Sequence, residues 1–153
     1  AAALQPDLDP AIAAGPDGVV SNGTPDAVWL TAESLGDRDP ALAARPGLTA
    51  VFVFDEPLLR RLQLDGRRLA FLAETLADLA GRRSLEIHRG RPEEVLAERP
   101  LAATFAPVPG WRRKAKLIRP VEIHPWPWLR RPGSGSVASF SAWRKAAEGS
   151  KGA

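Results

Sequence analysis

Short apolar runs alternate with helix-forming segments between residues 27 and 106, and this alternation constrains the fold more than any other feature of the chain. Residues 27–31 (AVWLT) and 49–55 (TAVFVFD) are rich in β-branched and aromatic side chains, which is typical of buried parallel strands. Between them, Asp39 and Pro40 form a helix cap followed by proline at the first helical position. The alternation predicts βαβ units in a parallel sheet with helices on both faces.

Further elements continue this pattern toward the C-terminus. The segment that begins at Asp65 has apolar residues at helical spacing, and Gly81 stands where such a helix would stop. Residues 84–88 (SLEIH) alternate as a half-exposed strand would, and Pro92 then opens a helix that runs through PEEVLAER. Two more strands are expected at residues 101–105 and 121–124. The sequence therefore predicts an α/β fold with five strands.

The composition excludes many classes of function. The chain has 153 residues, of which 44% are hydrophobic and 25% charged, figures that fit one domain of ordinary size. Cysteine and tyrosine are absent, which excludes disulfides, thiolate nucleophiles, Cys-ligated metals and phenolic acid–base chemistry. No apolar run approaches the roughly 18 to 20 residues of a membrane span, and the N-terminus lacks the layout of a secretion signal. We expect a protein of the cytoplasm with no membrane span.

Charge and proline content divide the chain into three parts. Residues 1–26 carry four aspartates, four prolines and no basic residue, and we expect an extension that lies on the surface or stays disordered. Residues 27–132 hold the α/β pattern. Residues 133–153 are a basic C-terminal segment, and from residue 107 onward the chain has ten basic and two acidic residues.

Several motifs in this order resemble the N-terminal α/β domain of DNA photolyases and cryptochromes. They are VWL, DPALAA, VFVFDEPLL, RRLAFLAETLADL and HRGRPEEVLAE within residues 27–106, followed by SVASFSAWRKAA at 136–147. The resemblance implies a Rossmann-like, doubly wound sheet of five parallel strands in the order 3-2-1-4-5. In that family the domain can hold an antenna chromophore, which is a flavin, a deazaflavin or a folate. The helical domain that holds the catalytic FAD has no counterpart here, so we expect no FAD site and no catalysis.

The chain departs from the family pattern in two places. Residues 31–35 (TAESL) replace an arginine-rich stretch that usually follows the first strand. Residues 110–116 (GWRRKAK) stand where the family has the helix between its fourth and fifth strands, and they are short for a standard crossover. The last edge of the sheet is therefore the least certain part of the expected fold.

A candidate cofactor site follows from the family's strand order. Ligands of open parallel sheets bind beyond the carboxyl ends of the strands where the order reverses, here between the first and fourth strands. The side chains that could line such a crevice are Thr31, Glu33, Asp55 and Trp111. In the alternative interpretation Asp55 caps a turn, Trp111 covers a sheet edge and side chains or the N-terminal extension fill the crevice. The loop at 31–36 has no glycine-rich phosphate-binding motif.

Two Glu-x-His pairs and one pair of arginines are further candidate functional residues. Glu86 and His88, and likewise Glu122 and His124, are spaced so that both side chains of each pair share one face of a strand. In the expected order these strands are opposite edges, so the pairs cannot share a metal ion, and solvated edges account for them. Arginines 67 and 68 begin the long helix, where the helix dipole disfavours cations. The matching position of the family is usually arginine-rich, and this resemblance implies packing or contact with an anion.

The basic C-terminal third also contains four of the five tryptophans. Aromatic and arginine side chains are common anchors of protein interfaces, and the proline-rich strip HPWPWLRRP could present them with little loss of entropy. The expected partner contacts are Trp126, Trp128, Arg130, Arg131 and Trp143. The first functional hypothesis is a non-catalytic interaction subunit of a larger assembly or a homo-oligomer. The alternatives are an antenna-chromophore binding module and nucleic-acid binding through the basic third.

Overall fold

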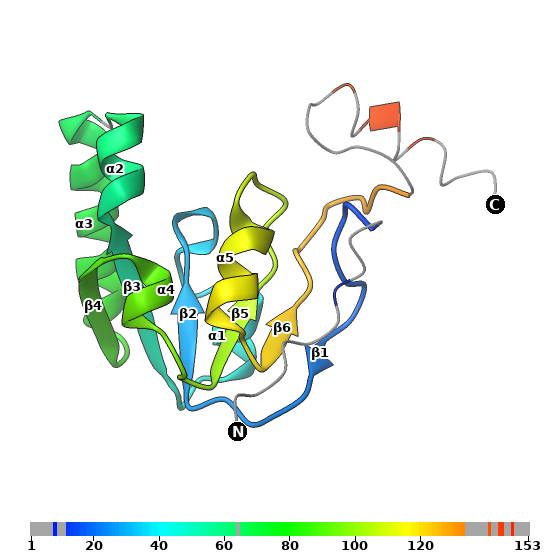
Figure 1. Cartoon of the computed structure of the whole chain (residues 1–153), viewed down its shortest axis with the longest axis horizontal. Helices are drawn as coiled ribbons and strands as arrows, with labels where there is room; N and C mark the ends of the chain where they lie inside the picture. The colour runs from blue at the N-terminus through cyan, green and yellow to red at the C-terminus, as the bar shows by residue number, and fades with distance from the viewer. Residues whose placement is uncertain are drawn as a thin grey trace.

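One six-stranded sheet organises the computed structural model, which describes residues 8, 12–63, 65–133, 141, 144, 145 and 148 (Figure 1). The strands lie in the order β1-β6-β5-β2-β3-β4, and every neighbouring pair is parallel except β1 with β6. The α/β class is confirmed, whereas the expected number of strands is too small by one. The strands are β1 (Val20–Ser21), β2 (Ala27–Leu30), β3 (Thr49–Asp55), β4 (Leu85–Gly90), β5 (Leu101–Thr104) and β6 (Glu122–His124).

The helices begin where the sequence places side-chain caps. The Asp39 carboxylate accepts a hydrogen bond of 2.9 Å from the Leu42 amide at the start of α1 (Pro40–Ala44). The Asp65 carboxylate accepts one of 3.0 Å from the Arg68 amide at the start of α3 (Gly66–Ala80). The first helix was expected from its cap, and the second from the spacing of its apolar residues. The other helical elements are the 3-10 turn η1 (Ala32–Ser34), α2 (Glu56–Leu62), α4 (Pro92–Val95) and α5 (Trp111–Ile118).

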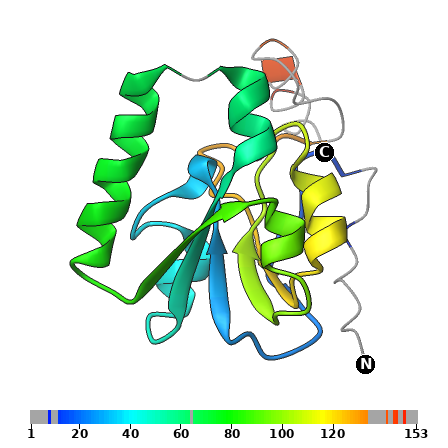
Figure 2. The same ribbon diagram turned by 60° about the vertical axis from the view of Figure 1, so that its left-hand side comes forward.

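Apolar side chains cover both faces of the sheet. Successive residues of a strand point to opposite faces, so Trp29 and Val51 pack on one side while Val28 and Phe52 pack on the other. The first cluster contains buried residues of α5, and the second contains Leu42 of α1 and two leucines of α3. Figure 2 shows α3 standing beside the sheet, while α2 rises beyond the end of β3. Among the described residues no helix has the length and apolarity to cross a membrane.

The connection from β5 to β6 corrects one sequence-based expectation. The short segment at 110–116 was expected to fall below a standard crossover, yet α5 covers eight residues and joins two strands that pair in parallel. Gly110 precedes the helix with φ +87°, a left-handed conformation that glycine adopts without steric strain. A turn at Gly110 and two turns of helix are therefore long enough to connect β5 to the parallel strand β6, and the sheet continues past β5.

The N-terminal extension contributes the sixth strand. Val20 and Ser21 pair with Ile123 and Glu122, so β6 is an inner strand and not the edge that the sequence predicted. The segment before this strand also packs against the fold, because Ala14 is buried and Gly15 lies against the Phe105 ring. This part of the extension lies against the surface of the fold, which is the first of the two expected alternatives, although most of its residues stay exposed.

Gly15 is the tightest point of this contact. It has φ +77°, and a Cβ at this position would lie 2.4 Å from Cδ1 of Phe105. We expect Gly15→Ala to lower the free energy of unfolding by about 2–3 kcal/mol, because both the backbone conformation and the ring contact oppose a methyl group. Urea unfolding measures the change. Gly18→Ala is the matched control, since a Cβ there meets nothing within 4 Å, and equal losses in the two variants would contradict the prediction.

Candidate ligand-binding site

The chain changes direction across the sheet at β2. From this strand it moves outward through β3 and β4, and it then crosses back to place β5 and β6 on the other side of β2. The loops that follow β2 and β5 diverge at such a point, and their divergence opens a crevice at the carboxyl ends of the strands. A cavity of about 830 Å³ lies there, between the strand ends, α2, the start of α3 and α5. Pockets that hold small molecules have volumes of this size.

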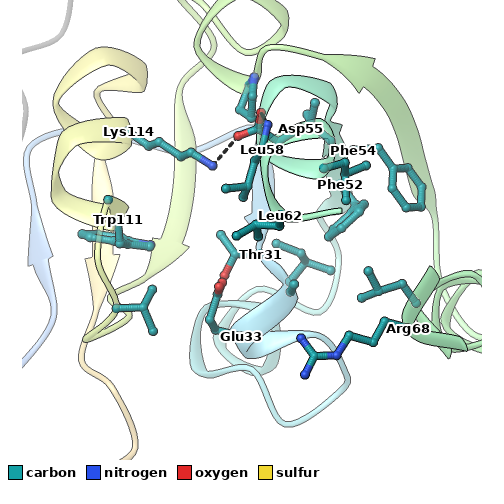
Figure 3. A pocket seen from close by; sticks show the side chains of 18 of the residues that line it. Thr31, Glu33, Phe52, Phe54, Asp55, Leu58, Leu62, Arg68, Trp111 and Lys114 are labelled. Atoms are coloured by element: carbon teal, nitrogen blue, oxygen red, sulfur yellow. Dashed lines mark hydrogen bonds and ion pairs between the residues drawn. The ribbon is translucent and has the colours of Figure 1, made fainter. Parts of the chain in front are cut away.

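Apolar side chains form the middle of this cavity (Figure 3). Phe52 and Phe54 extend from β3 with ring centroids 5.0 Å apart in an edge-to-face arrangement. Leu58 and Leu62 reach in from α2, which the sequence analysis did not predict. The remaining apolar lining comes from Trp29, Leu30, Val53, Leu59, Phe71, Leu72, Pro92, Val108, Pro109 and Trp111. An apolar, partly aromatic wall suits the faces of a planar ring system.

All four residues predicted for a cofactor site line this one cavity. Thr31 follows β2, and its Oγ1 atom is buried without a hydrogen-bond partner among the described residues. Glu33 lies in the adjacent turn η1 and is exposed, with no hydrogen bond or ion pair in the described part of the chain. Glu33 therefore leaves an exposed carboxylate beside the cavity with no partner among the described residues, whereas the Thr31 hydroxyl is buried.

Asp55 has a structural role in the wall of the cavity. One carboxylate oxygen accepts a hydrogen bond of 3.1 Å from the Leu58 amide, so Asp55 caps α2, as the alternative interpretation expected. The other oxygen forms an ion pair with the Lys114 ammonium of α5 (Figure 3). The pair links the end of β3 to α5 across the cavity. Because both oxygens are occupied, Asp55 contributes more to the shape of the site than to ligand hydrogen bonding.

Trp111 also contributes mainly to the wall of the cavity. Its side chain is buried, it stacks on Trp29 with centroids 6.2 Å apart at 15°, and it meets the Phe105 ring edge-on at 5.0 Å. Little of the ring is therefore open for the ligand stacking that the sequence suggested. Its Nε1–H has no hydrogen-bond acceptor among the described residues.

The sequence analysis missed most of the charged rim. Five basic side chains line the cavity, namely Arg61, Arg67, Arg68, Arg113 and Lys114, against the three carboxylates of Glu33, Asp55 and Asp65. Arginines 67 and 68 gave one sequence signal, because cations at the start of a helix oppose its dipole. The other basic residues gave none, since their approach to the cavity depends on how α2 and α5 fold over the strand ends.

Two of the five predicted partner contacts in the C-terminal third, Trp128 and Arg131, bind the chain's own N-terminal segment. The Trp128 indole donates a hydrogen bond of 3.1 Å to the Ala14 carbonyl. Arg131 donates to the carbonyls of Gly15 and Pro16, the second at 2.9 Å. Trp126 packs against the core cluster that contains Trp111, and Arg130 is half-buried. Trp143 lies outside the described residues.

The first Glu-His pair lies at an open edge of the sheet. Glu86 and His88 project from β4, and both side chains are about two-fifths exposed, with 3.2 Å between the His88 Nε2 and a Glu86 oxygen. Arg99 donates to the same oxygen at 2.8 Å, and this hydrogen bond lowers the pKa of Glu86, with a further contribution from His88. The solvated-edge interpretation is confirmed for this pair.

The second Glu-His pair is buried, so the same interpretation is wrong for it. Glu122 and His124 are 3% and 6% exposed, because β1 flanks β6 and α1 lies close to it. The Arg45 guanidinium donates to both Glu122 oxygens, at 3.1 and 2.5 Å, and a Glu122 oxygen is 2.7 Å from the His124 ring. The hydrogen bond from Arg45 is the main cause that lowers the pKa of Glu122.

The buried pair has an acidic neighbour at the start of α1. Burial raises the pKa of Asp39, opposed by hydrogen bonds from the Ser34 hydroxyl and the Leu42 amide. Thr104 accepts a hydrogen bond from the Ala41 amide nearby, so these side chains attach α1 to the ends of β5 and β6. Within the described residues no group of three or more His, Asp or Glu could hold a metal ion.

Comparison of the chain with protein-family models, with curated proteins and with solved structures gives no match. The resemblance to the photolyase and cryptochrome domain therefore stays a prediction from the motifs within residues 27–106. The function has to be argued from the cavity.

Proposed function

We propose that this chain is a non-catalytic binding module for a planar, conjugated small molecule of the flavin, deazaflavin or folate class. The observation that carries the proposal is the cavity of about 830 Å³ at the carboxyl ends of the strands, where the four candidate residues meet. Apolar walls from β3 and α2 suit the faces of a ring, and the exposed carboxylate of Glu33 suits its edge.

The order of the strands supports the same proposal. We propose that β2, β3, β4, β5 and β6 are the five strands of a doubly wound, Rossmann-like sheet in the order 3-2-1-4-5, to which β1 is an addition. The parallel strands lie in the sequence β4-β3-β2-β5-β6, and helices cover both faces. In sheets of this kind, the crevice beside the first strand is the usual place for a ligand.

The test is a binding titration with a variant that fills the cavity. Ala32 lines the cavity and is exposed, so Ala32→Trp places an indole in the space without disturbing the core. We expect this variant to bind riboflavin, flavin mononucleotide or folate at least tenfold more weakly than the parent, since the ring volume is taken. Ligand fluorescence or absorbance at equilibrium measures the dissociation constants.

Ala73→Trp is the matched control for this titration. Ala73 is also an exposed alanine, but it lies on α3 away from the cavity lining. The proposal requires that this control binds like the parent. An absorbance spectrum of the protein purified from its native cell adds a direct check, because a bound flavin or deazaflavin absorbs between about 300 and 500 nm. A parent chain that binds none of the three compounds would rule the proposal out.

A second candidate function is an interaction subunit, and one observation favours it. Leu62 and Phe71 line the cavity yet are 53% and 67% exposed, so apolar surface lies open at its mouth. Apolar surface of this kind is often covered by a second chain. A size-exclusion mass of the parent beside that of Leu62→Ser and Phe71→Ser tests this function. The interaction-subunit function predicts that the parent elutes as an assembly heavier than one chain, and that each substitution reduces this mass.

A further inference from the structure

Four arginines line the rim of the cavity, and they are unevenly distributed around it. Arg61 stands near the end of α2, Arg67 and Arg68 stand in the first turn of α3, and Arg113 lies on α5. All four line the cavity and are exposed. Figure 3 shows Arg68 extending from α3 toward the loop that carries Glu33. Three of the four are therefore concentrated at the corner between α2 and α3.

These arginines have no partner in the described part of the chain. Most other arginines of the fold do: Arg45, Arg82 and Arg99, for example, each form an ion pair. The lysine of the cavity is paired with Asp55. Of the two remaining carboxylates that line the cavity, Asp65 caps α3 and Glu33 lies in η1, and neither forms an ion pair with a described residue. Four unpaired cations face two unpaired anions, so the rim carries excess positive charge.

The helix adds to this charge at Arg67 and Arg68. Their position in the first turn of α3 places two cations beside backbone N–H groups that carry the positive end of the helix dipole. The Asp65 carboxylate caps the helix and offsets part of the dipole, but no described residue forms an ion pair with either guanidinium group. An anion at the corner between α2 and α3 would compensate for this arrangement, since it would meet both the guanidinium groups and the dipole.

We infer that the ligand of this cavity carries an anionic group, a phosphate or a carboxylate, which Arg61, Arg67 and Arg68 bind at the α2–α3 corner while the ring lies against the apolar wall. This inference rests on the proposed function and adds the class of ligand to it. Among flavins it favours flavin mononucleotide over riboflavin, which has the same ring and no phosphate. Folate, whose tail ends in carboxylates, tests the other source of negative charge.

The experiment compares three probes on the full chain. Dissociation constants of riboflavin, flavin mononucleotide and folate are measured at low and at physiological ionic strength. We expect flavin mononucleotide to bind at least tenfold more tightly than riboflavin at low salt, and we expect salt to reduce this ratio. In Arg67→Gln/Arg68→Gln the ratio should fall toward one, because flavin mononucleotide loses more affinity than riboflavin does.

A matched pair of single variants refines the test. Arg61→Gln should reduce the preference for the anionic probe severalfold, whereas Arg60→Gln should leave it unchanged. Arg60 is the neighbouring exposed residue of α2 and does not line the cavity. All of these side chains are exposed, so circular dichroism should show parent-like folding in each variant.

The outcomes separate the inference from the proposed function. Equal binding of riboflavin and flavin mononucleotide by the parent, together with folate binding that does not change in Arg67→Gln/Arg68→Gln, would overturn the inference and leave the binding module standing. A phosphate preference that survives Arg67→Gln/Arg68→Gln would also overturn it. If folate alone shows the arginine-dependent affinity, the anionic group is a carboxylate. If none of the three probes binds, the proposed function fails, and the inference fails with it.

Discussion

Replacing Trp111 with alanine should lower the free energy of unfolding by about 3–5 kcal/mol, one of the two largest effects that we expect of a single substitution in this chain. The side chain is 3% exposed and contacts the rings of both Trp29 and Phe105, so its removal leaves a void in the core under the cavity. Denaturant unfolding followed by fluorescence or circular dichroism measures the change.

Trp111→Phe is the informative comparison for this prediction. Phenylalanine retains an aromatic ring between Trp29 and Phe105, and it removes an indole N–H that has no acceptor among the described residues. We expect a loss of about 1–2 kcal/mol, well below that of alanine. If Trp111→Ala were as stable as the parent, the ring would not be part of the core, and the description of the cavity wall would be wrong.

The second large effect concerns the buried Glu122. Glu122→Ala should lower the free energy of unfolding at pH 7 by about 3 kcal/mol, because it removes an acceptor from Arg45 and from His124 in a buried site. Glu86→Ala is the matched control, since Glu86 belongs to the same Glu-x-His pattern on an exposed edge strand. Its expected loss is below about 1 kcal/mol.

The Glu122 effect should depend on pH in a defined direction. The hydrogen bond from Arg45 lowers the pKa of Glu122 in the folded state below its ordinary value, so its ionised form stabilises the fold. That stabilisation is fully present above the unfolded pKa and is lost as the pH falls through the lower, folded pKa. Unfolding curves of the parent and Glu122→Gln should therefore differ at pH 7 and converge in acid. Curves that stay parallel down to acid pH would contradict the ion pair.

Local signals explain which parts of the fold could be predicted. Asp39 and Asp65 cap helices whose starting residues lie within three positions of them, so the sequence contains the whole signal. The run at 49–55 is a strand with the expected bounds for the same reason. Helix α2 was not predicted, although Pro57 suits the first turn of a helix capped by Asp55.

The parts that could not be predicted depend on residues far apart in the chain. Nothing near Val20 indicates a strand, because its pairing with Ile123 supplies the structure. The burial of Glu122 depends on Arg45, 77 residues earlier, and on the position of β1. The candidate site shows the same division. The strand ends predicted Thr31 and Asp55, but the arginine rim appears only once α2 and α3 are folded over the sheet.

The pairing of the N-terminal segment with the end of the fold also has a kinetic consequence. Val20 and Ser21 pair with residues about a hundred positions later, and the carbonyls of residues 14–16 accept hydrogen bonds from Trp128 and Arg131. During synthesis the first segment emerges long before these partners exist, so it stays unpaired while β2, β3 and β4 associate with near neighbours in sequence. We therefore expect the edge of the sheet at β1 to close last.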